Sequence, residues 1–125
     1  MNNNMLKAAL RYAENGLPVV PFWWLKSDGT CACGKEKCKR GKHPIIREWQ
    51  KNASADTAQV TEWWTKYPYA NIGVLCGERS GWLVLDVDAG HGGYETLSSS
   101  FKIACQRLFT SISTVSGIYA LLFPL

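Results

Sequence analysis

The sequence lacks a long hydrophobic run and a secretory start. No apolar stretch in its 125 residues approaches the roughly 20 residues that a membrane-spanning helix needs. The opening Met1-Asn2-Asn3-Asn4 is polar and lacks the charged and then apolar layout of a signal peptide. Internal repeats are absent, as are low-complexity segments beyond these asparagines. We therefore expect a cytoplasmic protein with no membrane partner.

The sequence also lacks an even set of cysteines. Its five cysteines cannot all pair within one chain, and three of them lie between Cys31 and Cys38 with His43 close behind. This crowding favours a reduced compartment and a bound metal over disulfides. The other two, Cys76 and Cys105, lie in apolar surroundings and are expected to be core thiols. With 46% hydrophobic residues, the chain can build the core of a single domain over residues 1–125.

Apolar residues at helical spacing predict three helices. The first covers residues 5–13 and stops at Gly16. The second is capped by Asp56 with Gln59 three residues on, and ends before Pro68. The third covers residues 94–109.

Four β-prone runs lie between and after these helices. They are residues 17–24, 71–75, 82–87 and 112–125. The spacer 77–81 is typical of a turn, and we expect it to join the second and third runs as a hairpin. Helices and strands together predict an α/β (α+β) fold. The apolar tail stops without a polar ending, so we expect a domain that is incomplete at its C-terminus.

Residues 26–51 form a polar excursion that is too long for an ordinary connection. It contains three cysteines and a histidine in the pattern Cys-x-Cys-x4-Cys-x4-His, at Cys31, Cys33, Cys38 and His43. Three thiolates and one imidazole match a closed tetrahedral zinc site, which would order a loop that has no hydrophobic reason to fold. We predict structural Zn²⁺ here, the alternative being a cysteine-rich loop without metal.

The same loop is basic. Between Lys35 and Lys51, seven lysines and arginines stand against two acids, a local excess of five that is larger than the net charge of +4. A basic lobe on a nearly neutral chain suits a phosphate backbone, although lysines also simply solubilise loops. The predicted nucleotide- or DNA-binding residues in it are Lys39, Arg40, Lys42 and Arg47.

Two acids stand at the end of a buried strand pattern that begins with Leu83–Leu85. Asp86 and Asp88 are two positions apart, so strand alternation aims both at one face. Such a pair is typical of a site for Mg²⁺ or Mn²⁺, and the plain alternative is two turn acids that cap the next helix. His91 follows in a glycine-rich loop, where it could contact a nucleotide phosphate or face water.

The order of these motifs resembles the N-terminal domain of bifunctional DNA primase/polymerases, from the archaeo-eukaryotic primase superfamily found on plasmids and prophages. The resemblance runs from Leu6 to about Phe109. It is carried by Gly16-x-Pro18-Val19-x-Pro21, the cysteine cluster ending in Gly41-Lys42-His43-Pro44, Trp63-Trp64, Ala70-Asn71-Ile72-Gly73-Val74, and Gly81 through Asp88 with His91-Gly92-Gly93.

The resemblance implies an RRM-like catalytic sheet preceded by an inserted zinc loop. It also implies that Asp86 and Asp88 are catalytic and hold Mg²⁺ or Mn²⁺ for transfer of a nucleotide from an NTP or dNTP to a primer 3′-hydroxyl. The implied partners are a single-stranded DNA template and nucleoside triphosphates, with a fused or separate helicase as a further candidate.

The tail departs from this family. Where the family carries a pattern like Ser-Gly-Gly-x-His, with the histidine on the nucleotide phosphates, this chain has Ser116-Gly117-Ile118-Tyr119-Ala120. A further acidic metal ligand is also not found before Leu125. The alternative to an active primase/polymerase is therefore a catalytically inactive, zinc-stabilised module that binds nucleic acid or nucleotide.

Overall fold

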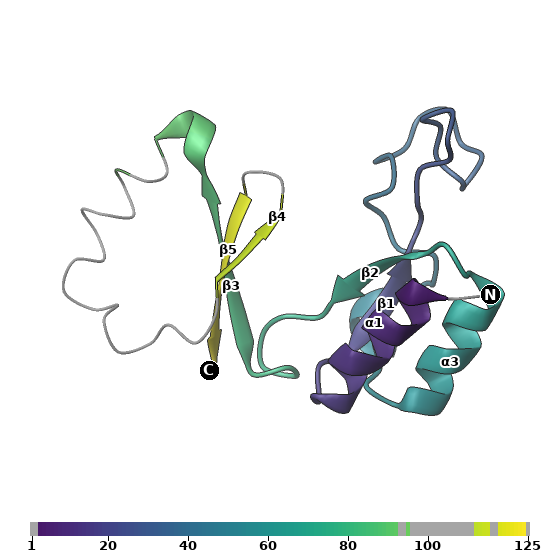
Figure 1. Cartoon of the computed structure of the whole chain (residues 1–125), viewed down its shortest axis with the longest axis horizontal. Coiled ribbons are helices and arrows are strands. Elements are labelled where there is room, and N and C mark those ends of the chain that lie inside the picture. The colour runs from purple at the N-terminus through teal and green to yellow at the C-terminus, as the bar shows by residue number, and fades with distance from the viewer. Residues whose placement is uncertain (1–2, 93–94, 96–111, 116–117, 125) are drawn as a thin grey trace. The chain divides into compact units, whose positions relative to one another are not determined.

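A computed structural model describes residues 3–92, 95, 112–115 and 118–124. It confirms a mixed α/β chain (Figure 1). The chain forms two compact units, Met1–Leu75 and Cys76–Leu125, and each is treated by itself below. A single domain over residues 1–125 stays a prediction. Among the helices of the described ranges, none is long and apolar enough to cross a membrane.

The first unit begins with helix α1, Asn4–Glu14. The side chain of Asn3 caps it by accepting a hydrogen bond from the Leu6 amide at 3.0 Å. Ala9 and Ala13 lie on its buried face. The chain leaves the helix at Gly16, whose φ of +77° is one that glycine adopts without strain. The helix predicted over 5–13 is confirmed.

Helix α3, Thr57–Lys66, packs against α1, and Val60 and Trp64 are its fully buried residues. The Trp64 indole donates a hydrogen bond to the Ala70 carbonyl at 3.1 Å, which satisfies its one polar atom in the core. Asp56 caps the helix as predicted, accepting from the Ala58 amide. The expected partnership with Gln59 is wrong: Gln59 bonds Glu62, and the Asp56 amide donates to Ser54 Oγ instead.

A two-stranded antiparallel sheet completes the unit. Strand β1, Val19–Phe22, pairs with β2, Asn71–Val74, in a register that sets Val20 opposite Gly73. Alternation along β1 divides its residues between two cores. Val19 packs with α1 and α3. Val20 packs on the other face, in a cluster that Trp49 of the short helix α2, Trp49–Asn52, also contacts.

Gly73 is required on that second face. A Cβ atom built there would lie 2.4 Å from a ring carbon of Phe22, so only glycine leaves room for the ring. The Phe22 ring in turn meets Trp49 edge-on, with centroids 6.1 Å apart. The glycine therefore fixes how β1 and β2 pack together.

The predicted hairpin across the spacer 77–81 is wrong. β2 pairs with β1, while the next strand, β3 (Trp82–Asp88), pairs with β5. The spacer closes on itself, with the Gly77 amide donating to the Trp82 carbonyl at 2.6 Å. Cys76, expected in the core, is exposed.

The second unit holds a three-stranded antiparallel sheet in the order β3-β5-β4. β3 runs into a short 3-10 helix, Ala89–His91, and the other strands are β4, Ile112–Val115, and β5, Ile118–Pro124. The β-prone tail is thereby confirmed. Cys105 and the helix predicted over 94–109 lie outside the described residues, apart from Glu95, which is helical.

Candidate metal centre

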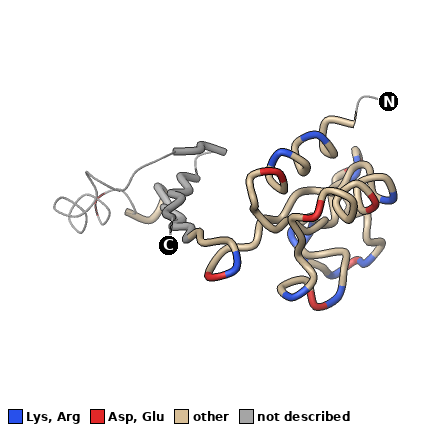
Figure 2. Tube along the Cα trace, turned by 90° about the horizontal axis from the view of Figure 1, so that it is seen from below, with Lys and Arg blue, Asp and Glu red and all other residues tan. Residues whose placement is uncertain are grey.

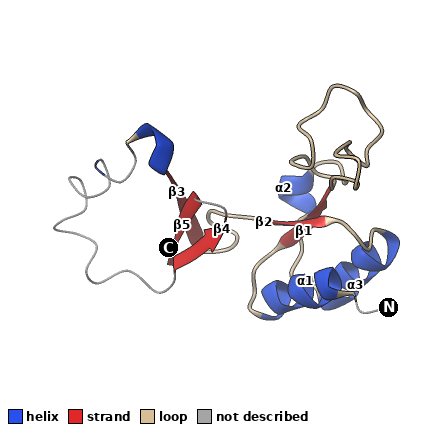
Figure 3. Cartoon of the chain, turned by 45° about the horizontal axis from the view of Figure 1, so that its top comes forward, coloured by secondary structure: helices blue, strands red, loops and turns tan. Residues whose placement is uncertain are grey.

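The predicted zinc loop leaves β1 as a long excursion and is fastened where it begins and ends. It rises from the sheet on the side away from α1 and α3 (Figures 1 and 3). The Trp23 amide donates to the His43 carbonyl at 3.0 Å, and Phe22 forms a β-bridge with Pro44. These contacts form a stem at the base of the loop and bring its two ends together.

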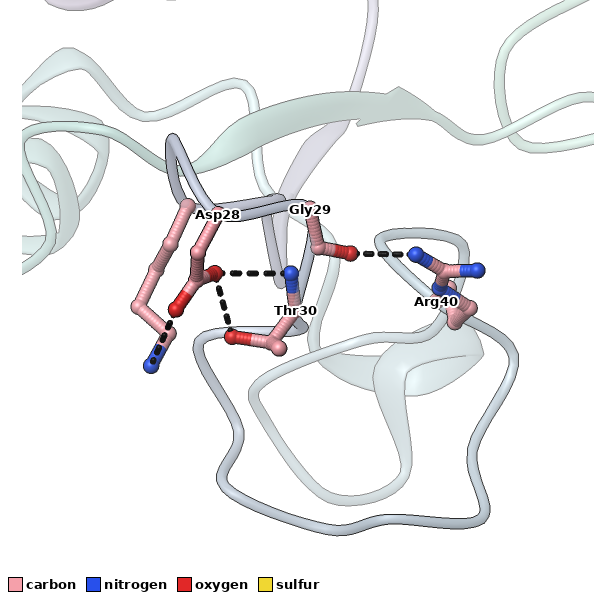
Figure 4. Close-up of polar contacts among 5 residues, drawn as sticks. Asp28, Gly29, Thr30 and Arg40 are labelled. Atoms are coloured by element: carbon pink, nitrogen blue, oxygen red, sulfur yellow. Dashed lines mark hydrogen bonds and ion pairs between the residues drawn. The ribbon is translucent and has the colours of Figure 1, made fainter.

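A tight turn at Asp28 shapes the first half of the loop (Figure 4). One carboxylate oxygen of Asp28 accepts from the amide and from the hydroxyl of Thr30, at 2.8 and 2.6 Å. The hydrogen bond from the Thr30 hydroxyl, and to a lesser extent the one from the Thr30 amide, lowers the pKa of Asp28. Arg40, from the second half of the loop, donates to the Gly29 carbonyl at the tip of this turn. The turn sends the chain back so that Leu25 bridges Cys31.

The four predicted ligands converge. The ligand atoms of Cys31, Cys33, Cys38 and His43 all lie within 4.8 Å of one another. Cys31 is buried, and the other three are half-buried. The Cys31 sulfur lies 3.6 Å from His43 Nε2. Two such ligands on one tetrahedral Zn²⁺, with Zn–S near 2.3 Å and Zn–N near 2.05 Å, would be about 3.6 Å apart. The cluster could therefore hold a metal such as zinc.

The electrostatics of the thiols also suit a cation. A hydrogen bond from the Cys33 amide, together with one from the Gly41 amide, lowers the pKa of Cys31 to about 6. Burial, followed by the hydrogen bonds and charge of the other two thiols, raises the pKa of Cys38 to about 11. One thiolate thus opposes formation of the next, and a divalent cation would remove that repulsion.

Asn71, the first residue of β2, contributes a contact that sequence reasoning did not assign. Its side-chain amide donates to the Trp23 carbonyl at 3.1 Å and to the Gly41 carbonyl at 3.2 Å. These two carbonyls belong to opposite arms of the loop, so one side chain ties the arms together beside His43. The motif Ala70-Asn71-Ile72-Gly73-Val74 was visible in the sequence, but not its partner atoms.

The predicted basic residues are all exposed, and Arg40 lines a cavity. Lys39, Arg40, Lys42 and Arg47 all belong to the excursion of residues 26–51. Lysines and arginines recur along the trace of the first unit (Figure 2). Arg40 lines an open cavity of about 430 Å³ beside the metal cluster, together with two lysines that the sequence did not single out, Lys26 and Lys35. Glu36 is the acid in the lining, so the cavity is mainly cationic.

The two acids lie in the second unit, on β3. In the antiparallel register, Asp86 is opposite Ala120 and Asp88 is opposite Ile118 on β5. His91 ends the short helix that follows and is exposed. Since the two acids are alternate residues of one strand, the backbone assigns them to the same face of the sheet.

Comparison with known proteins places these features in a family. The family model for the N-terminal region of bifunctional DNA primase/polymerase matches residues 9–117. The chain belongs to that family. Neither a curated protein nor a solved structure gave a match. The matched region contains the whole cysteine–histidine cluster and both acids of β3.

The family match ends at Gly117, immediately before β5. The residue at which primase/polymerases are expected to carry a phosphate-binding histidine is Ala120, the residue paired with Asp86. Residues directly opposite each other on antiparallel strands have Cβ atoms about 5 Å apart. A histidine at position 120 would therefore start next to the acid pair, and alanine offers no group that can bind phosphate.

Proposed function

We propose that this chain is a nucleotidyl-transfer domain that extends a primer 3′-hydroxyl with an NTP or dNTP on single-stranded DNA. The observation that carries the proposal is the primase/polymerase match over residues 9–117, with Asp86 and Asp88 at the end of a sheet strand inside it. In this proposal β3, β5 and β4 belong to an RRM-like catalytic sheet, and the chain is part of a plasmid- or phage-type replication protein.

Asp86 and Asp88 fit the role of metal ligands by their chemistry. Carboxylate oxygens on one face of a strand are the donors that Mg²⁺ and Mn²⁺ prefer. When bound, such cations activate the attacking hydroxyl and neutralise the charge of the triphosphate. The contribution of the chain would be to carry both acids at alternate positions of one strand, so that the two ligands do not have to be brought together during the reaction.

The first unit would serve the same reaction by binding nucleic acid. With four protein ligands, a zinc ion in the Cys31–His43 cluster would have no open position, which favours a structural role. Three thiolates with Zn²⁺ carry one negative charge, so the loop would remain basic and could bind the phosphates of a template strand. Lys26, Lys35 and Arg40, around one cavity, are the cations best placed to do so.

A second candidate function is supported by the register of β5. Because Ala120 stands opposite Asp86, the expected phosphate ligand is replaced by a methyl group. The chain would then be a zinc-stabilised nucleic-acid- or nucleotide-binding module that keeps the acid pair without turning over substrate.

Primer extension separates the two functions. The reaction contains a single-stranded template with an annealed primer, labelled dNTPs and Mn²⁺. The proteins compared are the wild type, the double variant Asp86→Asn/Asp88→Asn, and the control Glu62→Gln, which changes an exposed acid on α3. Extended product from the wild type and control, lost in the double variant together with Mn²⁺ binding by calorimetry, supports nucleotidyl transfer.

The other outcomes are equally informative. A wild-type chain that binds the template but makes no product supports the binding module. Product formation that survives in the double variant would refute the assignment of Asp86 and Asp88.

A further inference from the structure

A row of aromatic side chains lies on the first unit beside the zinc loop. Trp23 and Trp24 stack with centroids 5.8 Å apart and planes inclined by 29°. Tyr69 continues the row on the Trp24 side at 6.1 Å, and Tyr67 continues it on the Trp23 side at 6.3 Å. The four rings come from the end of β1 and from the segment after α3, and we call them the aromatic row.

Part of the aromatic row is not core. Trp23 packs into neither of the two hydrophobic clusters, and its ring contacts are with other members of the row and with His43. Tyr69 is 64% exposed. Trp24 and Tyr67 are half-buried and rest on the α1–α3 core, which fixes the row to a rigid base. Large rings held in place and open to solvent are typical of a binding surface.

Positive charge accompanies the rings. The Lys66 ammonium lies 5.4 Å from the centre of the Tyr67 ring. At the other side of Trp23, the His43 ring is 6.4 Å away, and His43 belongs to the loop with seven basic residues against two acids between Lys35 and Lys51. A ligand on the aromatic row would therefore meet cations nearby, which suits a polyanion with flat apolar groups.

The inclination of the rings distinguishes a single strand from a duplex. The Trp24 and Tyr69 rings are inclined by 48° and the Trp23 and Tyr67 rings by 63°, so the row offers no single flat platform to the parallel, continuous stack of bases in a duplex. Bases that lie against differently inclined rings must unstack and turn relative to one another, which a single strand permits and a paired duplex does not. Aromatic rings bind bases of any sequence, because every base has a π-face.

We propose that the aromatic row binds single-stranded nucleic acid by stacking with its bases, while Lys66 and the zinc loop contact its phosphates. The choice of nucleic acid as the ligand rests on the proposed function. The aromatic row shares no residue with the acid pair, so its binding of a single strand can be measured without turnover.

The test measures the equilibrium binding of a labelled oligothymidylate by fluorescence anisotropy, at low salt and without nucleotides, Mg²⁺ or Mn²⁺. The oligonucleotide has about twelve nucleotides, which is within the range of single-strand site sizes. The variants are Tyr69→Ala and Trp23→Ala, with Tyr69→Phe to keep the ring and remove the hydroxyl. The matched control is Tyr12→Ala, a tyrosine of α1 that is 43% exposed and is not in the row.

Each alanine variant of the row should weaken binding by about 5- to 150-fold, the loss expected from one stacked base. Tyr69→Phe and Tyr12→Ala should bind within about twofold of the wild type, and an unlabelled duplex of the same length should compete poorly. Circular dichroism and zinc content check that the variants are folded. If Trp23→Ala does not fold, the test rests on Tyr69→Ala.

The proposal is overturned if folded Tyr69→Ala binds as tightly as Tyr12→Ala, if the wild type does not bind the oligonucleotide, or if the duplex competes equally well. Primer extension is measured in parallel on the same variants. Primer extension by the wild type, combined with unchanged oligonucleotide binding by folded Tyr69→Ala, would sink this inference and leave the proposed function intact. Oligonucleotide binding that is lost with the row, in a chain that extends no primer, would do the reverse.

Discussion

Asn71 is expected to determine how tightly the loop holds its metal, because its side chain joins the two arms of that loop. Asn71→Ala removes two hydrogen bonds, to the Trp23 and Gly41 carbonyls. Each such bond contributes about 0.5–1.5 kcal/mol, and because the site is exposed, water will replace part of that. A total loss of about 1–2 kcal/mol corresponds to a zinc affinity roughly 5- to 30-fold weaker.

A second substitution at the same position tests the mechanism. Asn71→Asp keeps the size of the side chain but presents an acceptor to two carbonyl acceptors, so it should weaken zinc binding at least as much as alanine does. Asn52→Ala is the matched control. It removes a single hydrogen bond, to the Arg47 carbonyl at 2.9 Å, from an exposed asparagine that follows the loop stem.

The assay is competition for zinc against a chromophoric chelator at fixed pH, with thermal unfolding of each variant measured alongside. The expected order of affinity is wild type and Asn52→Ala first, then Asn71→Ala, then Asn71→Asp. If both Asn71 variants hold zinc within about twofold of the control, the two hydrogen bonds do not preorganise the loop, and the reasoning fails.

Three further predictions concern the sheet, the thiols and the second unit. Gly73→Ala should lower the melting temperature by roughly 4–20 °C, because the added methyl group overpacks the site at a cost of about 1–3 kcal/mol. Adding Phe22→Leu to the same chain should recover part of the loss. Equal melting temperatures for Gly73→Ala and wild type would contradict the contact between Gly73 and the Phe22 ring. The pKa of Cys38 is raised to about 11, so this thiol is protonated near neutral pH and must lose its proton when metal binds. Zinc affinity, measured by chelator competition, should therefore rise about tenfold per pH unit around neutrality for this proton alone. A zinc affinity that does not change with pH would contradict the role of Cys38 as a ligand. Ala120→His should increase primer extension, since it restores a phosphate ligand opposite Asp86, and no gain in a folded, Mn²⁺-binding variant would argue against that role.

The local features of the chain were predictable from sequence. α1 and α3 follow from apolar spacing and from one capping residue each, Asn3 and Asp56, although only the second cap was recognised. The metal cluster follows from four residues within thirteen positions, because chelating side chains so close in sequence have few other ways to be satisfied. In these cases the interacting residues lie near one another in the chain.

The features that depend on distant partners were not predictable. The pairing of β2 was assigned to its neighbour in sequence, while its real partner is β1, about fifty residues earlier, where Gly73 accommodates Phe22. The cationic cavity was missed for the same reason, since Lys26 and Arg40 come together only because the Asp28 turn folds one arm of the loop onto the other. No local pattern in the sequence encodes either contact.

The stem at the base of the loop suggests that the segment between Trp23 and His43 can be replaced by another segment. Phe22 and Pro44 are already bridged and the Trp23 amide already meets the His43 carbonyl, so the contact that a replacement segment must reproduce is the one between the Asn71 side chain of β2 and the Gly41 carbonyl. A short turn grafted across the stem should leave the β1–β2 register unchanged, and a longer metal-binding insert could be accepted at the same place. The length of this segment is thus free to vary in engineered chains, while the length of β1 and β2 is not.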